Sequence, residues 1–247
     1  MREIILKINE LSKVYPDGTK ALNSVSTEFI KGEFVSIIGP SGAGKSSFIR
    51  CINRLVEPSG GSIIFHNQDV VKAGSKDLRK LRRRIGMIFQ GHNLVKRSET
   101  LRNVLHGKLG YMSSIKGGLG LFSKKNIEEA IKLLERVGLQ EQAFKRADEL
   151  SGGQQQRVGI ARAIAQNPSI IMADEPIASL DPQSSDKVMK YFKTVCHEDK
   201  ITAIVNLHQV DFAKKFSDRI IGLKKGVLVF NGTPAELNDE ELHKIYN

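Results

Sequence analysis

The sequence is poor in the residues and runs on which several classes of protein depend. It has no tryptophan and only two cysteines among 247 residues. Cys51 and Cys196 are solitary and stand in apolar helical patterns, so we expect two buried thiols rather than a disulfide scaffold or a metal site. No apolar run approaches the roughly 18 residues that a membrane-spanning helix requires. Charge interrupts the short apolar run at the start of the chain, so we expect no signal peptide and a cytoplasmic location.

Acidic residues are outnumbered by basic ones, 27 against 38, which gives a formal net charge of +11. The basic residues are scattered apart from a cluster at residues 79–84. We interpret this cluster as a solvated helix face, with attraction to an anionic membrane surface as the alternative. Aromatic residues amount to 6% and no RNA-binding signature occurs, so nucleic acid is not expected as a partner.

A phosphate-binding loop is the first motif that carries chemistry. Residues 39–46 fit the pattern G-x-x-x-x-G-K-[ST] and lie between an apolar run and a plausible helix. Glycines in such a loop let backbone N–H groups approach phosphate oxygens, while Lys45 faces the β- and γ-phosphates and Ser46 contacts Mg²⁺. The residues expected to contact the nucleotide here are Gly39, Pro40, Ser41, Gly42, Ala43, Gly44, Lys45, Ser46 and Ser47.

Two neighbouring carboxylates end a second apolar run at residues 170–175. We expect a buried strand that delivers Asp174 towards Mg²⁺ and Glu175 towards the attacking water. General-base assistance of this kind contributes a factor of roughly 10²–10⁴ in rate. Together with the phosphate loop, this pair predicts that the chain binds ATP and hydrolyses it.

Three single residues are candidates whose alternatives stay open. Gln90 follows an apolar run and suits a contact with the metal and the water, or is a surface glutamine. His208 closes another apolar run and can donate to the γ-phosphate, or is a structural histidine. Tyr15 stacks on adenine or shields an edge strand.

The turn Leu-Ser-Gly-Gly-Gln at residues 150–154 lies just ahead of a predicted helix. Ser151, Gly152 and Gly153 therefore expose N–H groups at a positive helix end, and Gln154 completes the turn. One chain has no second phosphate for this turn. Pairing two chains head to tail gives it one, because each turn then covers the γ-phosphate held by the other chain.

Strand and helix patterns alternate along most of the chain, which indicates an α/β protein with a mainly parallel sheet. We expect a P-loop NTPase core of the RecA-like type with antiparallel β additions, formed by residues 1–90 and 158–247, and a helical subdomain inserted at residues 91–157. The expected details are strands at 3–14, 24–38, 85–90 and 201–207, a Gly/Ser-rich loop at 110–123, a helix capped by Asn126 and Glu129, a helix at 158–165 and a hairpin at 219–232.

The motifs and their order resemble those of ATP-binding subunits of ABC transporters. The resemblance extends over the whole chain, which would form a single cassette. The resemblance rests on Tyr15, residues 39–46, Gln90, residues 150–154, residues 170–175, residues 179–181 with Asp181, and His208. It implies a homodimer that sandwiches two Mg-ATP, closes on binding and reopens after hydrolysis. It also implies a peripheral position on the cytoplasmic face of the cell membrane, where two transmembrane permease subunits dock near Gln90 and the helical insertion.

Within that family the chain is most similar to phosphonate-import ATPases. The similarity lies in residues 93–97, 103–110, 119–123 and 205–211. It implies a phosphonate or a related oxyanion as the solute, delivered by an extracytoplasmic solute-binding protein. An importer for another small solute and an exporter remain alternatives. A non-transport cassette is disfavoured because the chain has neither long heptad repeats nor a second cassette. Ser98 and Glu99 depart from the usual pattern of the family near the partner groove, so the exact permease partner stays open.

Overall fold

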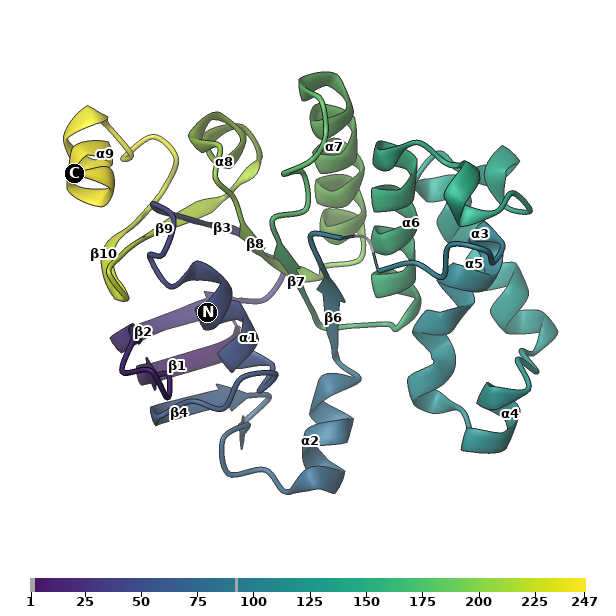
Figure 1. The fold of residues 1–247 in the computed structure, drawn as a ribbon, viewed down its shortest axis with the longest axis horizontal. Coiled ribbons are helices and arrows are strands. Elements are labelled where there is room, and N and C mark those ends of the chain that lie inside the picture. The colour runs from purple at the N-terminus through teal and green to yellow at the C-terminus, as the bar shows by residue number, and fades with distance from the viewer. Residues whose placement is uncertain (1–2, 92) are drawn as a thin grey trace.

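The computed structural model describes residues 3–91 and 93–247, whose strands form two sheets (Figure 1). One sheet has the order β2-β1-β4-β5, with every neighbouring pair antiparallel. The other has the order β10-β9-β3-β8-β7-β6 and is parallel except for the β9–β10 hairpin. The bounds of the strands are β1 Ile4–Val14, β2 Lys20–Ile30, β3 Phe34–Ile38, β4 Gly60–Phe65, β5 Gln68–Asp69, β6 Ile85–Ile88, β7 Ile170–Asp174, β8 Thr202–Asn206, β9 Arg219–Lys224 and β10 Val227–Gly232.

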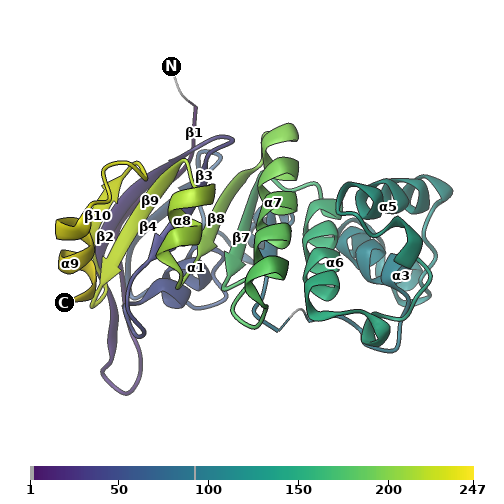
Figure 2. The same cartoon turned by 90° about the horizontal axis from the view of Figure 1, so that it is seen from above.

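Helices cover both faces of the parallel sheet, as Figure 2 shows. All residues of β3, β7 and β8 are buried, as expected of near-continuous Val, Ile and Ala runs between two helical layers. Alternate residues of β3 enter different cores: Val35 joins the one beneath α1, and Phe34 packs on Phe192 of α7 in the other. The helices are α1 Lys45–Ile52, α2 Ser75–Arg82, α3 Thr100–Leu105, α4 Ser114–Gly118, α5 Lys124–Arg136, α6 Gly152–Ala165, α7 Pro182–Glu198, α8 Val210–Phe216 and α9 Asp239–Tyr246, with 3₁₀ helices at His106–Tyr111, Gln140–Gln142 and Ala147–Glu149.

The helical insertion forms one end of the molecule. There α3 and α5 lie beside α6 (Figures 1 and 2). The opposite side of α6 contacts α7, so this helix joins the insertion to the parallel sheet layer. Because α6 begins at Gly152, the expected boundary at residues 157 and 158 falls within a continuous helix.

The fold class is confirmed, but several expected elements were wrong in their details. The run at 24–38 is two strands, because Gly32 takes a φ of 78° and turns the chain between β2 and β3. The expected loop at 110–123 contains α4, whose first turn is capped by the Ser113 side chain. Residues 89–90 lie beyond the end of β6, and residues 207–208 lie beyond β8.

The cap expected at Asn126 and Glu129 is also wrong. Ser123 caps α5 by accepting a hydrogen bond from the Asn126 N–H at 3.2 Å. Glu129 instead pairs with Lys108 Nζ at 2.8 Å, because the preceding 3₁₀ helix brings that lysine alongside α5. Because α5 begins at Lys124, Glu129 lies beyond its first turn and cannot take part in the cap.

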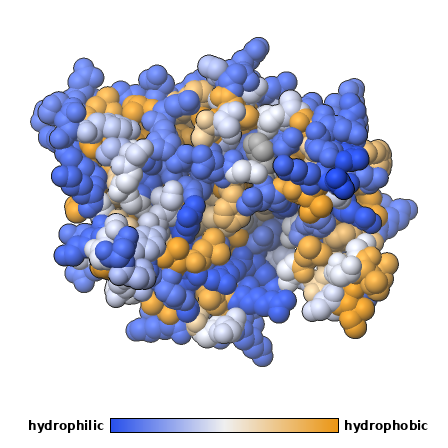
Figure 3. All heavy atoms as spheres, in the orientation of Figure 1, coloured by the Kyte–Doolittle hydropathy of each residue, from blue (hydrophilic) through white to orange (hydrophobic). Residues whose placement is uncertain are grey.

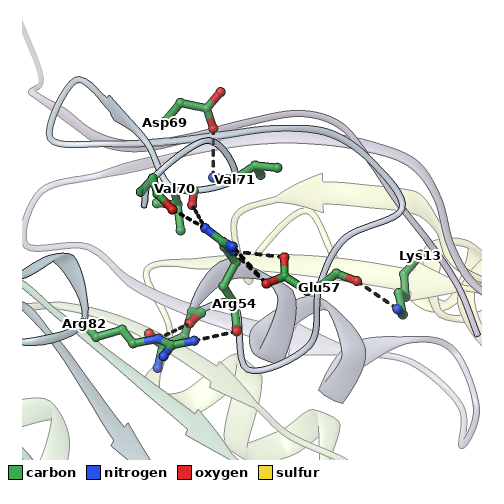
Figure 4. Close-up of polar contacts among 9 residues, drawn as sticks. Lys13, Arg54, Glu57, Asp69, Val70, Val71 and Arg82 are labelled. Carbon is green, nitrogen blue, oxygen red and sulfur yellow. Dashed lines mark hydrogen bonds and ion pairs between the residues drawn. The ribbon is translucent and has the colours of Figure 1, made fainter. Parts of the chain in front are cut away.

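Arg54 anchors the end of α1 to the segment that leads into α2 (Figure 4). Its guanidinium donates to the carbonyl oxygens of Val70 and Ala73 at 3.0 and 2.7 Å and pairs with Glu57 at 2.9 Å. Arg82 reaches back from α2 to the Arg54 carbonyl at 2.6 Å. The basic cluster at 79–84 is thus not wholly a solvated face, because Arg82 turns inward.

No helix of the described residues is long and apolar enough to span a bilayer.

Candidate nucleotide site

A cavity of about 340 Å³ lies where the phosphate loop meets the carboxyl ends of β7 and β8. Segments far apart in the sequence meet here because the carboxyl ends of parallel strands share one edge of the sheet. Its volume falls within the usual range of small-molecule sites, about 300–1,000 Å³. The cavity is lined by Tyr15, Thr19, Ala21, Ser41, Gly42, Ala43, Gly44, Lys45, Ser46, Ser47, Glu175 and His208.

Two glycines fix the path of the phosphate loop. Gly39 has a φ of 148°, and a Cβ there would overlap the carbonyl oxygen of Leu223 in β9. Gly44 has a φ of 99°, and a Cβ there would overlap the carbonyl oxygen of Ala21 in β2. Side chains are therefore excluded at both positions, by backbone conformation and by contact. The loop is held between β2 and β9 with α1 directly behind it.

Lys45 is folded back into its own loop. Its ammonium donates to the carbonyl oxygens of Gly39 and Pro40 at 2.7 and 3.1 Å, and the residue is 5% exposed. Burial lowers the pKa of Lys45, while the carboxylates of Glu175 and Asp174 oppose this shift. Lys45 is therefore a largely desolvated cation in the lining of the cavity.

Asp174 collects three donors at the end of β7. Its Oδ1 accepts from Ser46 Oγ and from Asn206 Nδ2, both at 2.8 Å, and its Oδ2 pairs with Arg50 Nη2 at 3.1 Å. Asn206 stands opposite Asp174 in the β7–β8 register, and its buried Oδ1 has no partner among the described residues. Carboxylate, hydroxyl and amide oxygens suit a hard divalent cation such as Mg²⁺.

Glu175 and His208 contact each other in the lining of the cavity. His208 Nε2 lies 2.6 Å from Glu175 Oε1. Glu175 has a φ of 53°, which is strained for a residue with a side chain, and its N–H donates to the Asn206 carbonyl at 3.2 Å. This backbone turn directs the carboxylate away from the strand and towards His208.

Tyr15 belongs to the cavity wall rather than to a remote edge. Its hydroxyl lies 3.0 Å from Ser47 Oγ, and Lys13 Nζ lies 5.0 Å from the centre of its ring. The ring therefore lies beside the phosphate loop, with Lys13 over one of its faces.

The remaining predicted site residues lie outside the lining of this cavity. Gln90 is exposed beyond the end of β6. Ser151 caps α6: its N–H donates to Gln154 Oε1 at 2.9 Å, and its Oγ accepts from the Gln154 N–H at 3.4 Å. Asp181 caps α7 by accepting from the Ser184 N–H at 2.9 Å. Gly152 and Gly153 lie against Leu180 and Ser184, so the Ser-Gly-Gly turn sits beside the start of α7.

Sequence reasoning missed two contacts of Asp174. Arg50 stands four residues after Ser46, on the same face of α1, so helical spacing alone placed it near any partner of Ser46. Asn206 is a polar residue that ends an apolar strand, the same signal that identified Asp174. Its importance needed the strand pairing, which sequence patterns did not supply.

Comparisons with known proteins identify the family of the chain. The pattern of the family described as "ABC transporter" matches residues 22–178. The "Phosphonates import ATP-binding protein PhnC 2" of Halalkalibacterium halodurans is 60% identical, over 98% of this chain and 100% of its own length. A protein of Treponema denticola named "Phosphonates import ATP-binding protein PhnC" is 52% identical, over 98% and 94%.

Solved structures give the same assignment. The cbiO1 structure from Clostridium perfringens, part of the ABC transporter complex cbiONQ, has a TM-score of 0.85 with 30% identity and covers 98% of this chain and 94% of its own. The dimeric structure of MJ0796, a bacterial ABC transporter cassette, has a TM-score of 0.80 with 35% identity over 93% and 98%. The resemblance expected from the motifs is confirmed: this chain belongs to the ABC transporter family.

Proposed function

We propose that this chain is the ATP-hydrolysing, energy-coupling subunit of an importer for phosphonates or related phosphorus oxyanions. The observation that carries the ATPase assignment is the meeting of Lys45, Glu175 and His208 around one cavity. Support for the solute comes from relatives named for phosphonate import, which align along nearly the whole chain. The cassette itself does not contact the solute, so the solute is inferred from those relatives.

The phosphate loop binds the triphosphate of ATP. Its glycine-bounded backbone and the N-terminus of α1 present N–H groups to phosphate oxygens. Lys45, released from the Gly39 and Pro40 carbonyls, places its charge against the β- and γ-phosphates. Tyr15 supplies the face on which adenine stacks.

Ser46 and Asp174 are the residues we propose as holders of Mg²⁺, together with Gln90. Ser46 Oγ and Asp174 Oδ1 already lie 2.8 Å apart, so both oxygens reach one small volume. When bound, the cation neutralises charge on the β- and γ-phosphates. Asn206 and Arg50 keep the Asp174 carboxylate oriented through hydrogen bonds at 2.8 and 3.1 Å.

Glu175 is the proposed general base, and His208 the residue that holds it. The hydrogen bond between them fixes the carboxylate orientation while leaving its other oxygen available to water. When ATP binds, the His208 ring is proposed to donate a hydrogen bond to the γ-phosphate. The strained backbone at Glu175 orients this pair before the nucleotide arrives.

The active form is proposed to be a homodimer. Ser151, Gly152 and Gly153 lie outside the lining of their own chain's cavity, yet they form the amino end of the long helix α6. Head-to-tail pairing lets this turn, with Gln154, cover the γ-phosphate of the partner, while Asp181 at the start of α7 adjoins the same interface. The dimeric structure of MJ0796 is a precedent for two cassettes together.

The two permease subunits are proposed to dock at the helical insertion, which we assign to residues 91–157. A hollow of about 670 Å³ there is lined by Val95, Arg97, Ser98, Glu99, Arg102 and His106. Gln90 lies just before it in the chain and links it to the nucleotide core, residues 1–90 and 158–247. Docking there places the protein on the cytoplasmic face of the membrane, with the solute-binding protein on the other side.

Reconstitution of the whole complex tests this function. We expect a phosphonate, delivered by its binding protein, to stimulate ATP turnover in vesicles that contain the permease subunits. Stimulation by another solute alone would overturn the phosphonate assignment and leave the ATPase assignment intact. Absence of Mg-ATP hydrolysis in the assembled complex would overturn both. A Val95→Glu variant should retain basal hydrolysis but lose uptake, because Val95 lines the proposed docking hollow.

A further inference from the structure

Large apolar side chains gather on the surface of one short segment, residues 109–121, here called the apolar loop. It comprises the end of the 3₁₀ helix after α3, then α4 and the turn that follows. Ile115, Leu119 and Leu121 are 77%, 67% and 59% exposed, and Tyr111 is 52% exposed. Figure 3 shows a hydrophobic patch at the lower right, where Figure 1 places α4. Soluble surfaces seldom group exposed aliphatic side chains in this way unless they meet something.

The apolar loop is fixed in place rather than merely exposed. The Tyr111 hydroxyl donates to the Arg83 carbonyl at 3.2 Å, and the Arg83 guanidinium lies 5.4 Å from the centre of the Tyr111 ring. Ser113 caps α4, and Phe122 packs against the core just after the loop. These anchors turn Ile115, Leu119 and Leu121 outward while the segment on either side is attached to the body of the protein.

Positive charge surrounds the apolar loop. The sequence has no acidic residue from position 100 to position 127, where it carries Arg102, Lys108, Lys116, Lys124 and Lys125. The packing of Tyr111 on Arg83 adds the basic cluster of residues 79–84 to the same region. Within residues 3–91 and 93–247, Arg79, Lys116 and Lys124 have no carboxylate partner.

We propose that the apolar loop inserts into the headgroup region of an anionic bilayer, with the neighbouring lysines and arginines on lipid phosphates. Exposed aliphatic side chains beside unpaired basic residues are what such a surface requires, since the bilayer supplies both an apolar layer and negative charge. A protein partner would have to bring its own acidic side chains to match. The contact is additional to permease docking and independent of ATP hydrolysis.

The absence of tryptophan from the chain provides a direct test. A Leu119→Trp variant places one fluorophore in the apolar loop, and Phe144→Trp places a matched one at a different site that is 71% exposed. With vesicles of phosphatidylglycerol and phosphatidylcholine, we expect Leu119→Trp emission to shift to the blue and Phe144→Trp emission to stay unchanged. Vesicles of phosphatidylcholine alone should give a smaller shift, and salt should reduce it because surface charges are screened.

Sedimentation of the full chain with the same vesicles measures affinity. Replacing Ile115, Leu119 and Leu121 together by Ser should weaken binding about tenfold or more, and each of Lys116→Glu and Lys124→Glu should weaken it roughly fivefold. ATP turnover of these variants should match that of the unchanged protein, which separates this test from the proposed function. Unaltered sedimentation of the triple variant would overturn the proposal. So would a Leu119→Trp shift that appears only with purified permease and never with anionic vesicles, since the occupant would then be a protein.

Discussion

Asn206 Nδ2 donates a hydrogen bond to Asp174 Oδ1 at 2.8 Å, across two paired parallel strands. The two residues stand opposite each other at the ends of β8 and β7, so the strand register itself produces the contact. An amide in this place orients the carboxylate without adding charge. Groups that orient the ligands of a metal ion often matter nearly as much as the ligands themselves.

Replacing Asn206 by Ala should therefore weaken the binding of Mg²⁺ that turnover requires. The Asp174 carboxylate would lose one of its three donors, and we expect the Mg²⁺ concentration for half-maximal hydrolysis to rise about tenfold or more. Titration of Mg²⁺ at saturating ATP measures this. Asn126→Ala, on the surface of α5, is the control and should leave the titration unchanged. An unchanged titration for Asn206→Ala would show that Asn206 has only a structural role.

The motifs whose chemistry depends on neighbours in the chain were predictable from the sequence. The phosphate loop needs a strand, a glycine-rich turn and a helix in succession, and the sequence pattern of residues 34–52 predicts all three. Asp174 and Glu175 were legible because an apolar run that ends in carboxylates is rare. The meeting of these segments followed from the parallel sheet, since strand ends of one sheet share an edge.

Contacts between segments without a common motif were not predictable. The contact of Asn206 with Asp174 required the pairing of β8 with β7. Helical spacing placed Arg50 beside Ser46, but its contact with Asp174 required the packing of α1 on β7. The α4 helix was not predicted because three glycines in residues 117–120 disfavour a helix, and the Ser113 cap is the one local signal for it. Glu129 looked like part of a helix cap, yet its charge was satisfied by Lys108 from another element.

Glu175→Gln should retain ATP binding but stop hydrolysis. Glutamine keeps the shape that pairs with His208 but cannot take a proton from water, so we expect turnover to fall by a factor of roughly 10²–10⁴. The proposed dimer should then accumulate, because in that proposal it reopens only after hydrolysis. Size-exclusion chromatography with ATP and Mg²⁺ measures this, with Glu128→Gln on the exposed side of α5 as the control. A purely monomeric Glu175→Gln protein would contradict the shared-site arrangement.

Ser151→Arg should abolish turnover while leaving the ATP affinity of the monomer nearly unchanged. A long cation at the start of α6 blocks the approach of the partner chain, and Ser151 is not part of the cavity of its own chain. Loss of a helix cap alone costs about 1 kcal/mol. Ser123→Arg, which removes the equivalent cap from α5, therefore controls for that loss and should keep its activity. If monomer affinity for ATP falls sharply in Ser151→Arg but not in Ser123→Arg, the turn serves its own chain instead.

The two thiols should be unreactive in the folded protein. Cys51 and Cys196 are 0% and 2% exposed, and burial raises the pKa of Cys51 from 9.0 to about 11 and raises that of Cys196 as well. Each native pKa lies above the unfolded value, so the stabilising contribution is complete below pH 9.0 and, for Cys51, is lost as pH rises to about 11. A disulfide reagent at pH 8 should react with neither thiol until denaturant is added. A Ser114→Cys variant supplies an exposed thiol for comparison. If a native thiol reacts as fast as that one, its helix opens readily: α1 for Cys51 and α7 for Cys196.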